Sequence, residues 1–168
     1  MELRMPSGRV ADLIGKGGET KKSLEKLAHV AISIQGNDVS IEGDPIGTIK
    51  AAEIVRAISR GFDAEDAFQL LNDDCRLDII SLEGESERTI KRLLGRVIGE
   101  KGRSKRKLEE YFDSSICIYG KTISIIGKYG DVRIARAAIE MLLAGRSHAF
   151  VYKAIEKRLA RRDRFVEY

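Results

Sequence analysis

Two glycine-framed segments decide the architecture of this chain: Leu13-Ile14-Gly15-Lys16-Gly17-Gly18 and Val97-Ile98-Gly99-Glu100-Lys101-Gly102. They lie 84 residues apart, and the same shift gives 12 identities over the 30 positions from Ile14 to Gly43. A repeat of fixed period reflects a repeated structural unit. The sequence therefore predicts two copies of one small domain, each carrying the same glycine loop.

Composition places the chain among folded proteins. With 168 residues, 43% hydrophobic and 33% charged, it suits two small domains, and because small cores are marginal alone we expect the halves to pack together. No apolar run approaches the roughly 18 residues of a membrane span. Two isolated cysteines, Cys75 and Cys117, exclude a disulfide framework or zinc site and fit a reducing cytosol, so we expect a cytoplasmic protein. The first repeat begins close to Met1, which is compatible with a truncated N-terminus.

Periodicity predicts the same element order in both copies: helix, glycine loop, helix, strand, tight turn, strand, helix. Each copy also needs an opening strand, clear at 76–82 and short or incomplete at 1–5. The predicted fold class is α+β, with two tandem domains that each place three helices on one face of a three-stranded antiparallel sheet. The remaining elements are expected at 19–28, 31–35, 39–41 and about 46–58, and at 103–112, 115–119, 123–126 and about 132–143.

Two further segments complete the predicted organisation. Residues 61–71 read as a helix capped at Asp63, with Phe62, Ala67, Phe68 and Leu71 on its apolar side. From residue 147 a basic helix follows, which is as compatible with a solvated face as with an RNA-contacting arm. The predicted boundaries are 1–60 for the first domain, 61–73 for the bridge, 74–145 for the second domain and 146–168 for the C-terminal helix.

The glycine loops have the properties of a phosphate-binding site. Glycines admit a close backbone, and the following helix presents free N–H groups and the positive end of its dipole. Flanking lysines and arginines would neutralise phosphates, and isoleucines before the loop and on the strand would floor a groove for about four unstacked bases. We expect single-stranded RNA as the ligand and no cofactor or metal. The candidate RNA-binding residues are Ile14, Gly15, Lys16, Gly17, Gly18, Lys21, Lys22, Ile32, Ile34, Arg96, Ile98, Gly99, Glu100, Lys101, Gly102, Arg103, Lys105, Arg106, Ile116 and Ile118.

Two alternatives to RNA binding stay open. The acidic residues of the bridge, from Asp63 to Asp74, could serve a metal-dependent nuclease, although a solvated capped helix explains them better. A protein-interaction scaffold with one degenerate copy is the other, since Glu100 lies in the second loop and the first opening strand is short.

The two segments resemble the type I KH domain, whose core pattern is V-I-G-x-x-G-x-x-I. Both copies place a lysine, Lys21 or Lys105, where the family has an aliphatic residue. The bridge at 61–71 and the tail from Gly145 to Tyr152 are similar to the archaeal paired-KH ribosome-assembly family and to the eukaryotic partner-of-nob-one and KRR-motif factors. The resemblance implies a non-catalytic protein that binds small-subunit pre-rRNA near its 3′ end. It also implies the rRNA-processing endonuclease and the alpha subunit of translation initiation factor 2 as partners.

Overall fold

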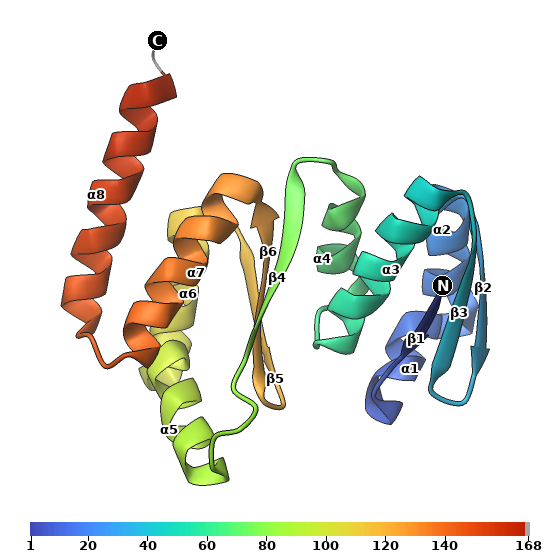
Figure 1. Ribbon diagram of the computed structural model, residues 1–168, viewed down its shortest axis with the longest axis horizontal. Coiled ribbons are helices and arrows are strands. Elements are labelled where there is room, and N and C mark those ends of the chain that lie inside the picture. Colours follow the sequence, from blue (N-terminus) through green and yellow to red (C-terminus); the bar gives the residue numbers. More distant parts are fainter. Residues whose placement is uncertain (167–168) are drawn as a thin grey trace.

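Two three-stranded antiparallel sheets organise the computed structural model, which describes residues 1–166 (Figure 1). Each sheet places the third strand of its half in the centre. The first sheet has the order β1 (Glu2–Arg4), β3 (Asp38–Gly43), β2 (Val30–Gln35), and the second β4 (Cys75–Ser81), β6 (Thr122–Lys128), β5 (Ser115–Tyr119). The predicted α+β class with two such sheets is confirmed, and the opening strand β1 is short, as expected.

The helices of each half occupy one face of that half's own sheet, in the same order in both halves. Short 3-10 turns, η1 and η3, form the glycine loops. The first half contains α1 (Ser7–Ile14), η1 (Lys16–Gly18), α2 (Glu19–Ala28) and α3 (Pro45–Ser59), and the second α5 (Glu87–Ile98), η3 (Glu100–Gly102), α6 (Arg103–Phe112) and α7 (Tyr129–Leu143). Local chemistry sets several ends: Asp44 caps α3 by accepting from the Gly47 N–H at 3.0 Å, and Ser86 caps α5 by accepting from the Thr89 N–H at 3.2 Å.

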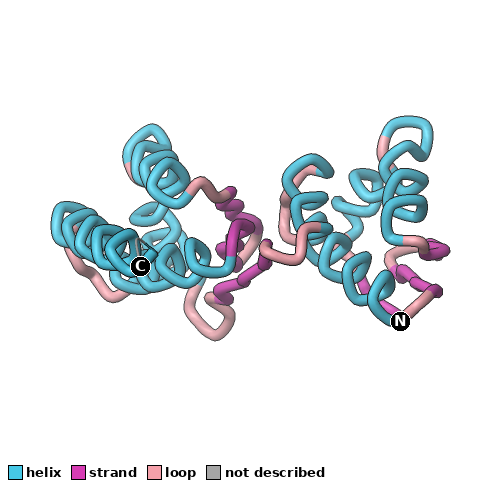
Figure 2. The backbone as a smooth tube through the Cα atoms, turned by 90° about the horizontal axis from the view of Figure 1, so that it is seen from above, coloured by secondary structure: helices cyan, strands magenta, loops and turns pink. Residues whose placement is uncertain are grey.

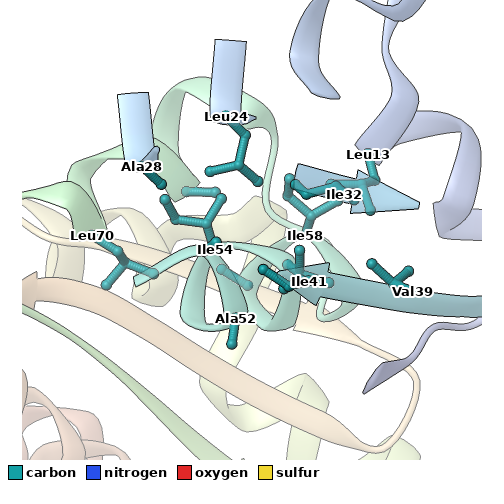
Figure 3. Packing of buried hydrophobic residues seen from close by; sticks show 14 of the residues in the cluster. Leu13, Leu24, Ala28, Ile32, Val39, Ile41, Ala52, Ile54, Ile58 and Leu70 are labelled. Carbon is teal, nitrogen blue, oxygen red and sulfur yellow. The ribbon is translucent and has the colours of Figure 1, made fainter. Parts of the chain in front are cut away.

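Each half has its own apolar core between its sheet and its helices. Figure 3 shows the first, where Leu13 and Leu24 from the helices flanking the glycine loop meet Ile41 of β3 and Ile54 of α3, all four fully buried. In the second core Leu108 and Phe112 of α6 meet Ile123 and Ile125 of β6. Burial of these side chains fixes the two helices around each loop, so the loops are held on rigid supports.

The bridge expected at 61–73 contains α4 (Ala64–Phe68) and η2 (Gln69–Leu71). Asp63 caps α4, because its carboxylate accepts from the Asp66 N–H at 2.8 Å. Phe62, Ala67 and Leu70 are buried in the first core, which also takes in Ile126 from the second sheet. Figures 1 and 2 show α3 and the bridge lying against the face of the second sheet that its own helices leave open.

The chain closes with α8 (His148–Val166), which packs on α7 at the end of the molecule away from the first half (Figure 1). The last two residues of the predicted C-terminal segment, 167 and 168, lie outside the described residues. Within residues 1–166, no helix combines the length and hydropathy needed to cross a bilayer.

Candidate nucleic-acid interface

The first glycine of each loop is required by helix packing. Gly15 and Gly99 end α1 and α5 with φ of +75° and +73°, and their N–H groups donate to carbonyls four residues back at 2.9 Å. A Cβ at Gly15 would stand 2.2 Å from Thr20 Oγ1, and one at Gly99 2.7 Å from Ser104 Cβ. No side chain fits at either position, so both helices meet at a closely packed turn.

The last glycine of each loop faces open space instead. Gly18 and Gly102 precede α2 and α6 with φ of +78° and +74°. A Cβ at Gly102 would meet nothing within 4 Å, and at Gly18 only the flexible end of Lys22 at 3.7 Å. This exposed backbone and the first N–H groups of the next helix form a surface that a phosphate can approach.

The two loops differ at their third position. Gly17 and Lys101 share a left-handed backbone, with φ of +64° and +55°. A lysine in this region costs conformational energy that a glycine does not. The second loop therefore carries a cation at its tip at some cost in stability, whereas the first carries Lys16 one position earlier.

The predicted basic residues surround both loops. Lys16 and Lys22 are exposed at the first loop, and Lys101, Arg103 and Arg106 at the second, where Glu100 is also exposed. Their positive charge favours a polyanion at both sites.

Lys21 and Lys105 are engaged in a contact that the sequence analysis missed. Their ammonium groups lie 3.2 and 3.1 Å from Glu25 and Glu109, whose carboxylates also accept the N–H groups of Ile32 at 2.8 Å and Ile116 at 2.9 Å. We call this arrangement the Lys–Glu clamp. The bond from Ile32 and then the nearby Lys21 hold the pKa of Glu25 below its usual value, against the opposing effect of burial. Glu25 and Glu109 are identical at the 84-residue shift, and this identity was the only sign in the sequence that the two glutamates have a shared role.

The clamp limits which backbone groups at the strand edge remain free for hydrogen bonding. In β2 and β5 the pairs that close the two-residue hairpins are Gln35–Asp38 and Tyr119–Thr122. Alternate residues therefore point their backbone groups away from the sheet. Glu25 and Glu109 occupy the outward N–H groups of Ile32 and Ile116, and the next outward groups belong to Ile34 and Ile118.

The structure divides the predicted groove isoleucines into two sets. Ile14 is 37% exposed, and Ile34, Ile98 and Ile118 are half-buried near the surface. Ile32 and Ile116 are only 4% and 3% exposed and belong to the two cores. Their side chains are buried in the two cores, on the same strand face that carries the more exposed Ile34 and Ile118 two residues later.

Arg96, also predicted to bind RNA, is directed into the protein. Its Nε donates to the Leu142 carbonyl at 2.8 Å and its NH2 to the Arg146 carbonyl, which secures the junction of α7 and α8. In the first half Arg9 makes the equivalent bonds, to the Ile58 and Phe62 carbonyls, both at 2.8 Å. Arg9 and Arg96 are not related by the 84-residue shift, so the repeat gave no hint of this shared role.

Three acidic residues of the bridge have structural contacts. Asp63 caps α4, Asp66 accepts from the Ser115 hydroxyl at 3.1 Å, and Asp73 pairs with Lys50 at 2.7 Å. Among residues 1–166 no three His, Cys, Asp or Glu side chains converge in a way that could hold a metal ion.

Comparison with known proteins gives consistent matches. A KH domain-containing protein of Methanocaldococcus jannaschii is 43% identical over 163 residues, covering 92% of this chain and 72% of its own. The RNA-binding protein pno1 of Dictyostelium discoideum is 34% identical over 122 residues, which cover 67% of this chain and 50% of that protein.

Solved structures match across nearly the whole chain. Dim2p from Pyrococcus horikoshii has a TM-score of 0.86 and 41% identity, covering 94% of this chain and 98% of its own. The complex of a/eIF2alpha, aDim2p and rRNA from the same organism contains a chain with a TM-score of 0.87 and 42% identity, covering 94% and 92%. The sequence model of the eukaryotic type KH-domain matches residues 2–74 and again 76–160. With both of its glycine loops inside these matches, the chain belongs to the eukaryotic-type KH-domain family, KH-domain type I.

Proposed function

We propose that this chain is a tandem pair of type I KH domains that binds single-stranded RNA without catalysis. Both halves follow the order strand, helix, helix, strand, strand, helix, and both sheets place the last strand in the centre. The two separate matches of the family model, one in each half, support counting two domains.

The observation that carries the proposal is the open backbone at Gly18 and Gly102. Each lies between a closely packed helix turn and a helix N-terminus, with nothing but solvent or a flexible lysine end above it. Exposed lysines and arginines flank both positions. A sugar-phosphate chain needs all three features: close approach, N–H donors and positive charge.

Base recognition would follow beside the phosphates. We assign it to the surface formed by Ile14 and the outward edge of Ile34 in the first domain, and by Ile98 and the edge of Ile118 in the second. Unpaired bases can hydrogen-bond to a strand edge and lie on aliphatic side chains, whereas stacked duplex bases cannot.

We further propose a role in maturation of small-subunit rRNA, with binding near the 3′ end. A 42% identical chain of Pyrococcus horikoshii is found with a/eIF2alpha and rRNA, and a 29% identical protein of Schizosaccharomyces pombe is named a pre-rRNA-processing protein. We take the alpha subunit of initiation factor 2 and the rRNA-processing endonuclease as partners, and the cytoplasm as the location.

The test replaces Lys101 and Gly102 by aspartate. The left-handed backbone at Gly102 makes an added side chain cost about 1 to 2 kcal/mol, but its Cβ would meet nothing and aspartate tolerates this conformation better than most residues, so the variant should fold. The added carboxylates should lower affinity for a single-stranded RNA about tenfold or more. Lys128→Asp with Gly84→Asp is the matched control, since it removes one lysine and fills another open glycine with positive φ. Equal affinity of the loop variant and the control would remove the second loop from the site.

Salt and strandedness provide independent checks. If about four to six basic side chains contact phosphates, log affinity should fall against log salt with a slope near −3 to −4. A duplex of the same sequence should bind more weakly. The RNA should remain intact after incubation with magnesium, and cleavage would contradict the non-catalytic assignment.

A further inference from the structure

The C-terminal helix α8 packs an apolar stripe against the body of the protein. Val151 and Ile155 are fully buried in the second core, and Tyr152 and Leu159 pack partly against it. An amphipathic helix that binds a membrane must offer its apolar face to the lipid. This apolar stripe of α8 is already covered, and Phe150 and Phe165 are the large apolar side chains of the helix that stay exposed. The side of α8 available to a partner is therefore mainly polar.

The opposite face of α8 is basic. With 3.6 residues per turn, five side chains fall within an arc of about 80° on the side away from Val151 and Ile155. All five are exposed, and we call them the α8 stripe: Phe150, Lys153, Lys157, Arg161 and Arg164. Successive cations along the stripe are about one turn, roughly 6 Å, apart.

The two acids of α8 do not neutralise the positive charge of this stripe. Glu156 accepts from the Tyr111 hydroxyl at 2.9 Å, and Asp163 lies 3.6 Å from Arg162, which also pairs with Asp131. Among the ion pairs of residues 1–166, none involves Lys153, Lys157 or Arg161. Glu156 is thus engaged with Tyr111 and Asp163 with Arg162, and neither acid pairs with a cation of the stripe.

The stripe starts beside the second glycine loop. Arg96 lies three residues before Gly99, its guanidinium bonds the Arg146 carbonyl, and its own carbonyl lies 2.9 Å from His148 Nε2. Arg146 in turn stacks on the Phe150 ring at 5.2 Å. The first turn of α8 is therefore tied to the last turn before the loop, and the helix runs from there along the outer end of the molecule (Figure 1).

We propose that the α8 stripe binds the phosphate backbone of a double-helical RNA segment adjoining the single strand held at the second glycine loop. This rests on the proposed function of that loop. The stripe is a convex row of cations without a groove, so it cannot enclose splayed bases. Phosphates of folded RNA can be contacted by such a row independently of sequence. The protein would then recognise a junction between a stem and an unpaired tail.

The test uses a variant with Lys153→Gln, Lys157→Gln and Arg161→Gln. Its matched control carries Arg4→Gln, Lys128→Gln and Arg133→Gln, three exposed cations outside the stripe and both loops. Two RNAs are compared: a hairpin stem with a single-stranded tail, and the tail alone. Because all six residues are exposed, both variants should keep the thermal midpoint of the parent protein.

The stripe variant should bind the stem–tail RNA about tenfold more weakly, with a salt slope reduced by about 2 to 3. Its affinity for the tail alone should stay within about twofold of the parent, and the control should bind both RNAs nearly as the parent does. Unchanged binding of stem–tail RNA by the stripe variant, equal losses in the control, or an equal loss on the tail alone would each overturn the proposal. Failure of the parent protein to bind the tail would instead refute the proposed function of the loops.

Discussion

The outer faces of the two sheets, those turned away from their own helices, differ in their surroundings. The first is exposed to solvent and the second is covered by the first half. In the first half this face is polar and exposed, with Ser33, Gln35 and Glu42. The positions 84 residues later are Cys117, Tyr119 and Ile126, which face α3 and the bridge. Strand β3 accordingly alternates between buried and exposed residues, whereas the first six residues of β6 are all buried.

Close contacts fix this arrangement. A Cβ at Gly61 would stand 2.7 Å from Cys117 Sγ, so the bridge begins in direct contact with β5. The guanidinium groups of Arg9 and Arg60 each lie 5.9 Å from the centre of the Tyr119 ring. Burial raises the pKa of the Cys117 thiol, as expected inside an interface. The buried inner positions Ile32 and Ile41 recur as isoleucine in the second half, whereas the outer positions 33, 35 and 42 are polar in the first half and Cys, Tyr and Ile in the second.

Exchanging the residues at the equivalent positions 42 and 126 should give the largest effect on the free energy of unfolding, because only one of the two positions is buried. Ile126→Glu puts a carboxylate into the first core and should lower the free energy of unfolding by at least about 4 kcal/mol. Glu42→Ile changes an exposed position and should alter it by less than about 0.5 kcal/mol. Urea denaturation measures both. Similar small effects would mean that the second sheet is not covered by the first half.

Truncating the aromatic side chains of the bridge should come next in size. Phe62 is 3% exposed and Phe68 packs against the same core. Phe62→Ala with Phe68→Ala should cost about 3 to 4 kcal/mol through the cavity left behind. If the halves lose their fixed relation, affinity for a long RNA should fall while affinity for a four-nucleotide RNA stays nearly constant. A folded variant with full affinity for long RNA would show that the bridge is a passive linker.

Local patterns predicted most of the fold. The glycine loops, the hairpins and the helix at 19–28 follow from short-range periodicity and turn chemistry, and α2 spans Glu19–Ala28 as predicted. The burial of β6 on both faces is a tertiary feature that the sequence also indicates. Ile123, Ile125 and Ile126 form the nearly continuous apolar run that is typical of such a strand.

The sequence could not predict contacts that depend on the third dimension. Arg9 reaches a carbonyl 49 residues away. The bonds of Arg96 to the Leu142 and Arg146 carbonyls likewise have no local signal in the sequence. Ile32 was expected in the groove because strand alternation gives two faces without saying which is inside. The Lys–Glu clamp links a helix to a strand edge, and only the meeting of both elements reveals it.

Exchanging the third residue of the two loops tests their difference. Lys101→Gly relieves a left-handed lysine, and Gly17→Lys introduces one. We expect a change in stability of about 1 kcal/mol, positive for the first and negative for the second. RNA affinity should change in the opposite sense, because a cation is removed or added. Thermal denaturation and RNA titration of both variants check this, and parallel changes in stability and affinity would contradict it.

The smallest expected effect concerns the clamp, which both halves share. The pKa of Glu25 is lowered in the folded protein, so its charge stabilises the fold above its ordinary pKa. That contribution is lost as pH falls through the lowered value. Glu25→Gln keeps an acceptor for the Ile32 N–H but not the charge. At pH 7 the variant should be less stable by under about 1 kcal/mol, since the pair is partly exposed to solvent.

Below the lowered pKa the parent protein carries a neutral Glu25, so the difference between parent and variant should shrink as the pH falls through that pKa. Urea unfolding across pH 3 to 7 measures this, with Glu42→Gln as the control for removing a surface carboxylate from the same sheet. A difference that persists at low pH would mean that the clamp acts through the geometry of its hydrogen bonds. In that case the charge pair with Glu25 would not explain why Lys21 stands where the KH pattern has an aliphatic residue.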